Sequence, residues 1–150
     1  QYEATGTEIK VYGAIDKFLT SRNKENLTAI NISQNVNLTR LNCTYNQLSS
    51  LNVSQNVNLT ELDCFDNQLS SLDVTKNVNL TELYCWDNQL SSLDVSKNTK
   101  LKLLDIHENN FSTSVLNNIY CQLPDRTGKG KGYVYPASIS TDYLEARLVC

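Results

Sequence analysis

The chain has 150 residues, of which 40% are apolar, and it carries 13 Lys and Arg against 16 Asp and Glu. This length fits one domain with a hydrophobic core, and the net charge of −3 argues against a strongly basic nucleic-acid-binding protein. No stretch approaches the ~18 consecutive apolar residues of a membrane-spanning helix. Because the sequence contains no methionine, we expect Gln1 to be a processed or trimmed start.

Residues 1–25 are expected to cap the repeats that follow, since an open stack of repeats would expose its core. Ile9 and Val11 alternate with polar residues as in a strand. Ile15, Phe18 and Leu19 follow at the spacing of a helix.

Residues 26–111 repeat with a period of 21. Three blocks align without a gap from Leu38, Leu59 and Leu80, and each reads LxxLxCxxNxLxxLxVxxN. A fourth block starts at Leu101 and then loses the pattern, while residues 26–37 match the second half of a block. Such periods indicate stacked units that bury their apolar faces against one another.

Each block predicts one flattened coil. Its second leucine and its cysteine point inward from a short strand, and the next block adds the same strand at ~4.8 Å, which gives one parallel sheet. A 21-residue coil leaves little room for a helix, so we expect the other side to be mostly extended. Turns without sheet partners are expected to be held by two asparagine columns: Asn46, Asn67, Asn88 and Asn109, and Asn35, Asn56, Asn77 and Asn98.

Residues 112–150 are expected to form the C-terminal cap of this single domain. Val115, Leu116, Ile119 and Tyr120 predict a short helix that ends by Pro124. Residues 133–135 predict a last strand.

The block resembles the leucine-rich repeat, whose core is LxxLxLxxNxL. Its 21-residue length, with cysteine where leucine is usual, is similar to the cysteine-ladder repeats of internalin-like bacterial surface proteins. The resemblance implies an α/β leucine-rich-repeat solenoid, a short, curved, right-handed coil with one concave parallel sheet. It also implies a secreted or cell-surface protein that binds other proteins.

The five cysteines cannot all be paired in disulfides, because their number is odd. Cys43, Cys64 and Cys85 occupy the inward column, where we expect small buried hydrophobic groups. Zinc sites use CxxC-type pairs that converge on one point, so we expect neither a metal nor another cofactor. Cys121 and Cys150 lie in the C-terminal cap, and in a secreted protein they either form a disulfide or stay free.

The outward positions of the concave sheet carry acids and aromatic rings, and one stripe reads Thr44, Phe65, Trp86, His107. These positions hold seven acids and one arginine, a net charge of −6, whereas the whole chain has −3. Acidity is therefore concentrated on one surface. The candidate binding residues are Tyr45, Glu61, Asp63, Phe65, Asp66, Glu82, Tyr84, Trp86, Asp87, Asp105, His107 and Glu108.

Four such strands offer a patch of roughly 300 Å², less than the ~800 Å² that each partner contributes to a standard protein interface. Either the caps join the interface, the ligand is small, or several copies act together.

We expect a non-enzymatic, extracellular binding module that recognises a protein with a basic or hydroxyl-rich surface through Phe65, Tyr84, Trp86 and the nearby acids. The alternatives are a glycan-binding accessory protein, with Trp86 and Tyr84 stacked on sugar rings, and a structural subunit of an outer-surface complex. A hydrolase would need a carboxylate pair in a cleft, which a shallow sheet does not offer.

Overall fold

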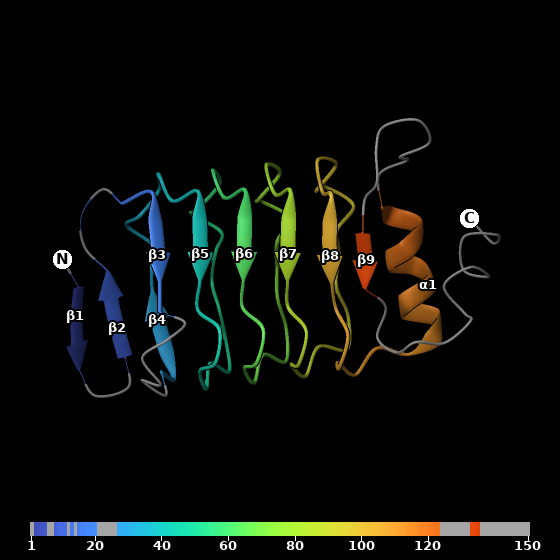
Figure 1. Ribbon diagram of the computed structural model, residues 1–150, viewed down its shortest axis with the longest axis horizontal. Helices are drawn as coiled ribbons and strands as arrows, with labels where there is room; N and C mark the ends of the chain where they lie inside the picture. The colour runs from blue at the N-terminus through green and yellow to red at the C-terminus, as the bar shows by residue number, and fades with distance from the viewer. Residues whose placement is uncertain are drawn as a thin grey trace.

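The computed structural model describes residues 2–5, 8–11, 13, 15–20, 27–123 and 133–135, with the backbone alone at 2–5 and 133–135. Figure 1 shows a row of strands side by side, with β1 and β2 at one end and α1 at the other. The elements are β1 Tyr2–Thr5, β2 Glu8–Val11, β3 Lys17–Leu19, β4 Ala29–Asn31, β5 Arg40–Asn42, β6 Glu61–Asp63, β7 Glu82–Tyr84, β8 Leu103–Asp105, α1 Thr113–Gln122 and β9 Tyr133–Tyr135.

The main sheet consists of six parallel strands in the order β3-β5-β6-β7-β8-β9. On β5 to β8, each central leucine lies opposite the next, and all four are buried: Leu41, Leu62, Leu83 and Leu104. The register advances by one block per strand, so the same block position recurs on every neighbouring strand. The predicted solenoid of stacked coils with one parallel sheet is confirmed.

The N-terminal segment differs from the prediction. Ile9 and Val11 are buried on β2, as the alternation predicted, and β2 pairs with β4 in a separate three-stranded sheet. The helical interpretation of Ile15, Phe18 and Leu19 is wrong, because Lys17–Leu19 forms β3 and pairs with β5. Phe18 lies opposite Leu41 and packs against the core, so pairing with the next strand overrides the local spacing.

The core is built from columns of identical block positions. Leucine, cysteine and valine columns run from coil to coil, and Cys43, Cys64 and Cys85 are fully buried with free thiols. Ile106 continues the cysteine column in the last coil, also fully buried. The column therefore packs as small apolar side chains, as predicted.

The side opposite the main sheet is made of turns. In the described residues between β5 and β6, β6 and β7, and β7 and β8, there is no helix or strand. Each turn is closed by the same backbone bond, such as that from the N–H of Asn77 to the carbonyl of Val74, 2.9 Å. The lack of a helix between these strands agrees with the expectation, whereas the expected run of short extended segments is replaced by turns and irregular backbone.

Buried and partly buried amides hold the turns in both predicted asparagine columns. The Nδ2 of Asn67 donates to the carbonyls of Cys43, Cys64 and Phe65 at 3.0, 3.1 and 3.2 Å, and its Oδ1 accepts from the N–H of Leu48 at 3.0 Å. One amide thus joins two coils and satisfies carbonyls that have no sheet partner.

Helix α1 covers the last coil, as predicted from its apolar spacing. It buries Ile119 and Tyr120, and Gln122 Oε1 accepts a 2.8 Å hydrogen bond from the N–H of Val95. Cys121 is disulfide-bonded, and Cys150 lies outside the described residues.

Substituting alanine for Asn77 tests the second amide column. The Nδ2 of Asn77 donates to the carbonyls of Val53 and Asn56 at 3.1 and 2.9 Å, and both would lose their buried donor in Asn77→Ala. We expect the free energy of unfolding in urea to fall by about 2 to 3 kcal/mol. Asn58→Ala, which removes an exposed donor to the Val36 carbonyl, is the control and should cost less than about 1 kcal/mol. Equal losses would contradict the role of burial.

The cysteine column should be inert to alkylation in the folded protein. Burial raises the pKa of Cys43 to about 12 and holds the pKa of Cys64 well above its usual range, so thiolate is scarce at pH 8. We expect peptide mapping to find iodoacetamide adducts on Cys43, Cys64 and Cys85 only after unfolding in urea. Rapid labelling of Cys64 under native conditions would show that the column is open to solvent.

Candidate functional site

The outer face of the main sheet carries the predicted acids. The two residues that flank each buried leucine point away from the core. On β6 these are Glu61 and Asp63, and on β7 they are Glu82 and Tyr84, all four partly exposed. The structure therefore brings these four candidate residues together on neighbouring strands.

Strand β3 adds two residues to this face that sequence reasoning missed. Lys17 lies in register with Arg40, and Leu19 lies in register with Asn42 and is 66% exposed. A signal was present, because Ile15, Phe18 and Thr20 repeat the LxxLxC spacing 23 residues before Leu38, Leu41 and Cys43. The interval of 23 rather than 21 hides it from a search at one fixed period.

Beyond the strand ends, four rings lie in one continuous row, which we call the aromatic ladder: Tyr45, Phe65, Trp86 and His107. Phe65 and Trp86 are stacked with centroids 4.3 Å apart and planes 12° apart, and Trp86 and His107 with 4.8 Å and 10°. The Tyr45 ring meets Phe65 edge-on at 5.1 Å and 83°. Because Phe65 and His107 come from the coils on either side of Trp86, both faces of the indole are covered.

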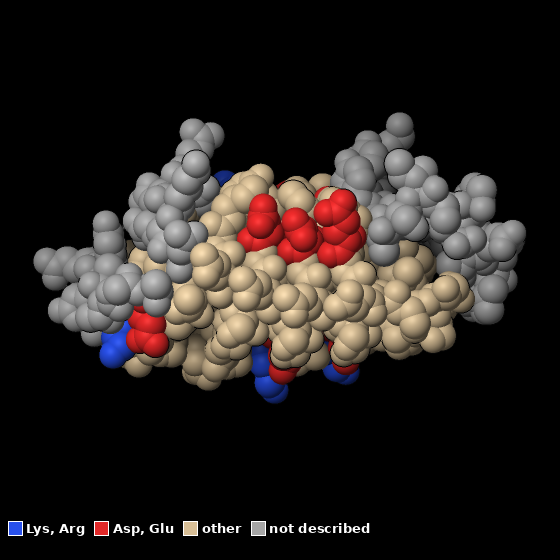
Figure 2. Space-filling view, turned by 90° about the horizontal axis from the view of Figure 1, so that it is seen from below, with Lys and Arg blue, Asp and Glu red and all other residues tan. Residues whose placement is uncertain are grey.

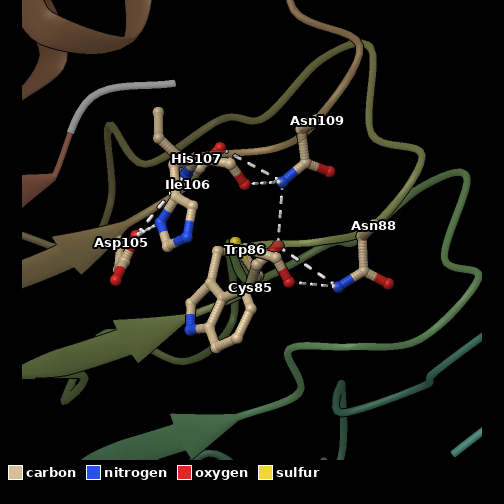
Figure 3. A network of polar contacts seen from close by, with 7 residues as sticks. All are labelled: Cys85, Trp86, Asn88, Asp105, Ile106, His107 and Asn109. Atoms are coloured by element: carbon tan, nitrogen blue, oxygen red, sulfur yellow. Dashed lines mark hydrogen bonds and ion pairs between the residues drawn. The ribbon is translucent and has the colours of Figure 1, made fainter. Parts of the chain in front are cut away.

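The amide column positions the ladder. Figure 3 shows Asn88 Nδ2 donating to the carbonyls of Cys85 and Trp86, and Asn109 Nδ2 donating to those of Cys85 and His107. The carbonyl of Trp86 also accepts a 3.1 Å bond from the N–H of Asp66. The backbone on both sides of each ring is thus tied to the next coil.

The block position after the ladder residues Phe65, Trp86 and His107 has an unusual backbone. Four residues there have φ in the left-handed region: Tyr45, whose ring reaches the ladder, with 58°, Asp66 with 53°, Asp87 with 50° and Glu108 with 51°. Asp is common there, but Tyr and Glu are not, and each costs roughly 1 kcal/mol. Tyr45, Asp87 and Glu108 are exposed and Asp66 is partly exposed, so the strained turn presents side chains to solvent.

Asp63 is the carboxylate with the most strongly perturbed environment on the strands. Its Oδ2 accepts a 3.0 Å bond from Asn42, while its buried Oδ1 has no hydrogen-bond partner among the described residues. Burial, and then the charge of Glu61, raise the pKa of Asp63 to about 6. Arg40 forms an ion pair with Glu61 instead, so Asp63 is left half-buried without a cationic partner.

Two sequence predictions for this face are wrong. Thr44 does not continue the aromatic stripe, because it is buried and its hydroxyl donates to Asn42 Oδ1 at 3.0 Å; Tyr45 takes that place. Asp105 is buried rather than displayed, and its Oδ1 contacts His107 Nδ1. Asp105 therefore orients the last ring of the ladder and is not a free surface acid.

The remaining acids leave this side of the molecule negative. Figure 2 views the molecule from the end at which the strands terminate, and near the upper middle it shows a group of acidic side chains with no Lys or Arg among them, whereas the acids at the lower edge lie next to Lys or Arg. Lys17 and Arg40 lie on β3 and β5, at the N-terminal end of the sheet. The charge of the outer face therefore changes from positive to negative along the row of strands.

Within the part of the chain that the structure describes, no group of three or more His, Cys, Asp or Glu side chains could hold a metal ion. No helix there has the length and apolar character needed to cross a membrane.

Asp63→Asn should stabilise the protein above pH 6, with Asn42 of the preceding coil as a native precedent for asparagine at this position. Because the pKa of Asp63 is higher in the folded than in the unfolded protein, its carboxyl makes its full contribution to stability below pH ~3.9. That contribution is lost as the pH rises through about 6. We expect a gain of about 1 kcal/mol in urea at pH 8, limited by solvent screening of a half-buried group, and none at pH 3.5. Asp73→Asn is the control, because hydrogen bonds from Thr75 lower the pKa of Asp73. An equal gain at both pH values would contradict the assignment.

The comparisons with known proteins agree with this architecture. No family model matches the chain, and no curated protein matches it. Among solved structures, the functional domain of InlJ from Listeria monocytogenes, which includes a cysteine ladder, is 25% identical with a TM-score of 0.58. The match covers 80% of this chain and 31% of that one.

Two further structures are similar. Internalin C2 from Listeria monocytogenes is 25% identical with a TM-score of 0.54, over 59% of this chain and 41% of that one. A leucine-rich-repeat protein of Leptospira interrogans is 20% identical with a TM-score of 0.61, over 83% and 36%, and shows the fold alone. The chain spans well under half the length of each. With its 21-residue coils, parallel sheet and buried cysteine column, the chain is a leucine-rich-repeat solenoid of the internalin-like type.

Proposed function

We propose that the chain is a non-enzymatic, extracellular module that binds a protein partner through the outer face of its main sheet. Proteins of this repeat type with a similar fold include internalins. The disulfide at Cys121 supports an oxidising compartment, where such bonds persist.

The aromatic ladder is the observation that carries the proposal. Phe65, Trp86 and His107 are partly exposed and Tyr45 is 53% exposed, beside the exposed acids Asp87 and Glu108. Rigid rings lose little entropy on binding, and a surface that combines such rings with uncompensated charge is typical of a binding site. The ladder also lies on the same side as the acids of β6 and β7, so one partner can contact both.

The glycan alternative rests on Trp86 and Tyr84, and this geometry argues against the first of the two. Sugar rings stack on an open aromatic face, but Phe65 and His107 cover the two faces of Trp86. Only the edge of the indole remains available, which favours a polypeptide over a sugar at this position.

The double substitution Phe65→Ala and Trp86→Ala should abolish capture of a specific protein from surface extracts of the producing cells. Retention by the wild type should fall as salt rises from 50 to 500 mM, because screening weakens attraction to the acidic face. Affinity pull-down followed by mass spectrometry measures both effects.

Two further variants guard against loss of folding. Val57→Ala with Val78→Ala removes two exposed apolar side chains from turns away from this face and should retain the partner. Asp66→Asn with Asp87→Asn keeps residues that tolerate the left-handed backbone and should weaken retention. If all three double variants capture the same proteins as the wild type, the outer face of the sheet is not the binding surface.

A further inference from the structure

The ligand-facing chemistry of this surface consists of ring edges and carboxylates. In the ladder, the stacked contacts at 4.3 and 4.8 Å leave no space for a guest between Phe65, Trp86 and His107. A ring edge bears partial positive charge and packs against aliphatic groups, while a cation needs a ring face. Cations are therefore expected to bind the acids beside the ladder, not the rings themselves.

Acids lie on both sides of the ladder. On the strand side are Asp63 and Glu82, both partly exposed, and on the turn side are Asp66, Asp87 and Glu108. The side chains of Lys and Arg have long aliphatic stems that cover apolar surface while the charged head reaches out. If the aliphatic stem of a Lys or Arg lies over the ring edges, its charged head reaches the carboxylates on one or the other side of the ladder.

Asp63 is the acid that gains most from a cation. Its Oδ1 is buried without a partner among the described residues, and Glu61 on its own strand and Glu82 on β7 add negative charge. Asn42 and Arg40 on β5 both favour the charged form, but Arg40 is engaged by Glu61. Tyr84 on β7 donates to Glu82 Oε2 at 3.1 Å and leaves Asp63 without a donor from that side.

We propose that the ligand is a short, extended polypeptide segment with at least two Lys or Arg residues, which lies along the ladder across β6–β8 and places one cationic head on Asp63. The proposal rests on the proposed protein-binding function and names the chemistry of its partner. Three coils span roughly 10 Å, which is the length of three to four extended residues. A ligand segment of this length fits a patch that is too small for a standard protein interface.

Binding of a cation should be coupled to the proton on Asp63. Burial and Glu61 raise the pKa of Asp63 to about 6 in the free protein, and a bound cation favours the ionised form. Affinity should therefore rise as pH increases from 5 to 7.5, by about tenfold for one proton released near pH 6.

The test uses the full chain and an acetylated, amidated octapeptide of alternating Arg and Ser, with Trp86, the one tryptophan of the sequence, as the fluorescent reporter. We expect the peptide to bind at pH 7.5 and 50 mM salt, and about tenfold more weakly at pH 5. A Glu-Ser octapeptide and maltohexaose are the control ligands and should not bind. Calorimetry of the same titrations in two buffers reports the released proton.

Asp63→Asn should weaken binding of the Arg-Ser peptide by about 10- to 100-fold in Kd, the contribution of a charge-assisted hydrogen bond, and should reduce the pH dependence. The control variant Asp73→Asn makes the same chemical change on the side opposite the main sheet, and Asn52 occupies the same block position one coil earlier. This variant should bind the Arg-Ser peptide like the wild type. Equal Kd values for the two variants, or an undiminished pH dependence in Asp63→Asn, would overturn the role of Asp63.

The two proposals can fail separately. If the wild type captures a protein in the pull-down but binds neither the Arg-Ser peptide nor any basic segment of that protein, the outer face binds a partner and the basic-segment proposal is wrong. If maltohexaose binds as tightly as the Arg-Ser peptide, the polypeptide assignment itself is wrong.

Discussion

This structure depends on one constraint: the backbone carbonyl groups at the turns have no sheet partners and need hydrogen-bond donors from elsewhere. Each coil has only three strand residues, so most of its backbone must find hydrogen bonds elsewhere. The asparagine amides supply them, and Asn67 alone contacts three carbonyls and one N–H in two coils. Because these amides connect one coil to the next, they also impose the gap-free register that brings identical positions face to face.

The aromatic ladder follows from that register. A ring at one block position meets the ring at the same position of the next coil, so Phe65, Trp86 and His107 stack instead of projecting separately. Stacking stabilises the rings and covers their faces, which changes what they can recognise. The same repetition places Glu61 beside Glu82, and like charges on neighbouring strands destabilise the folded state.

This local conflict points to function. Asp63 keeps a half-buried carboxylate next to Glu61 with no ion-pair partner, although Asn42 occupies the same position one coil earlier without that cost. Glu108 and Tyr45 occupy left-handed positions that suit Asn or Asp better. Residues that reduce stability locally are expected at sites shaped by binding, and all three belong to the aromatic ladder or to the acids around it.

The sequence by itself determined the repeat length, the parallel sheet, the inward cysteine column, the asparagine columns and the surface that collects the acids, because each of these follows from block position alone. Only the tertiary structure decided the rest. Strand β3 depends on pairing with β5 across an irregular interval, and the burial of Thr44 and Asp105 depends on hydrogen bonds with Asn42 and His107. Ring stacking and the orphaned oxygen of Asp63 arise from distances between side chains on different coils, which a one-dimensional pattern does not contain.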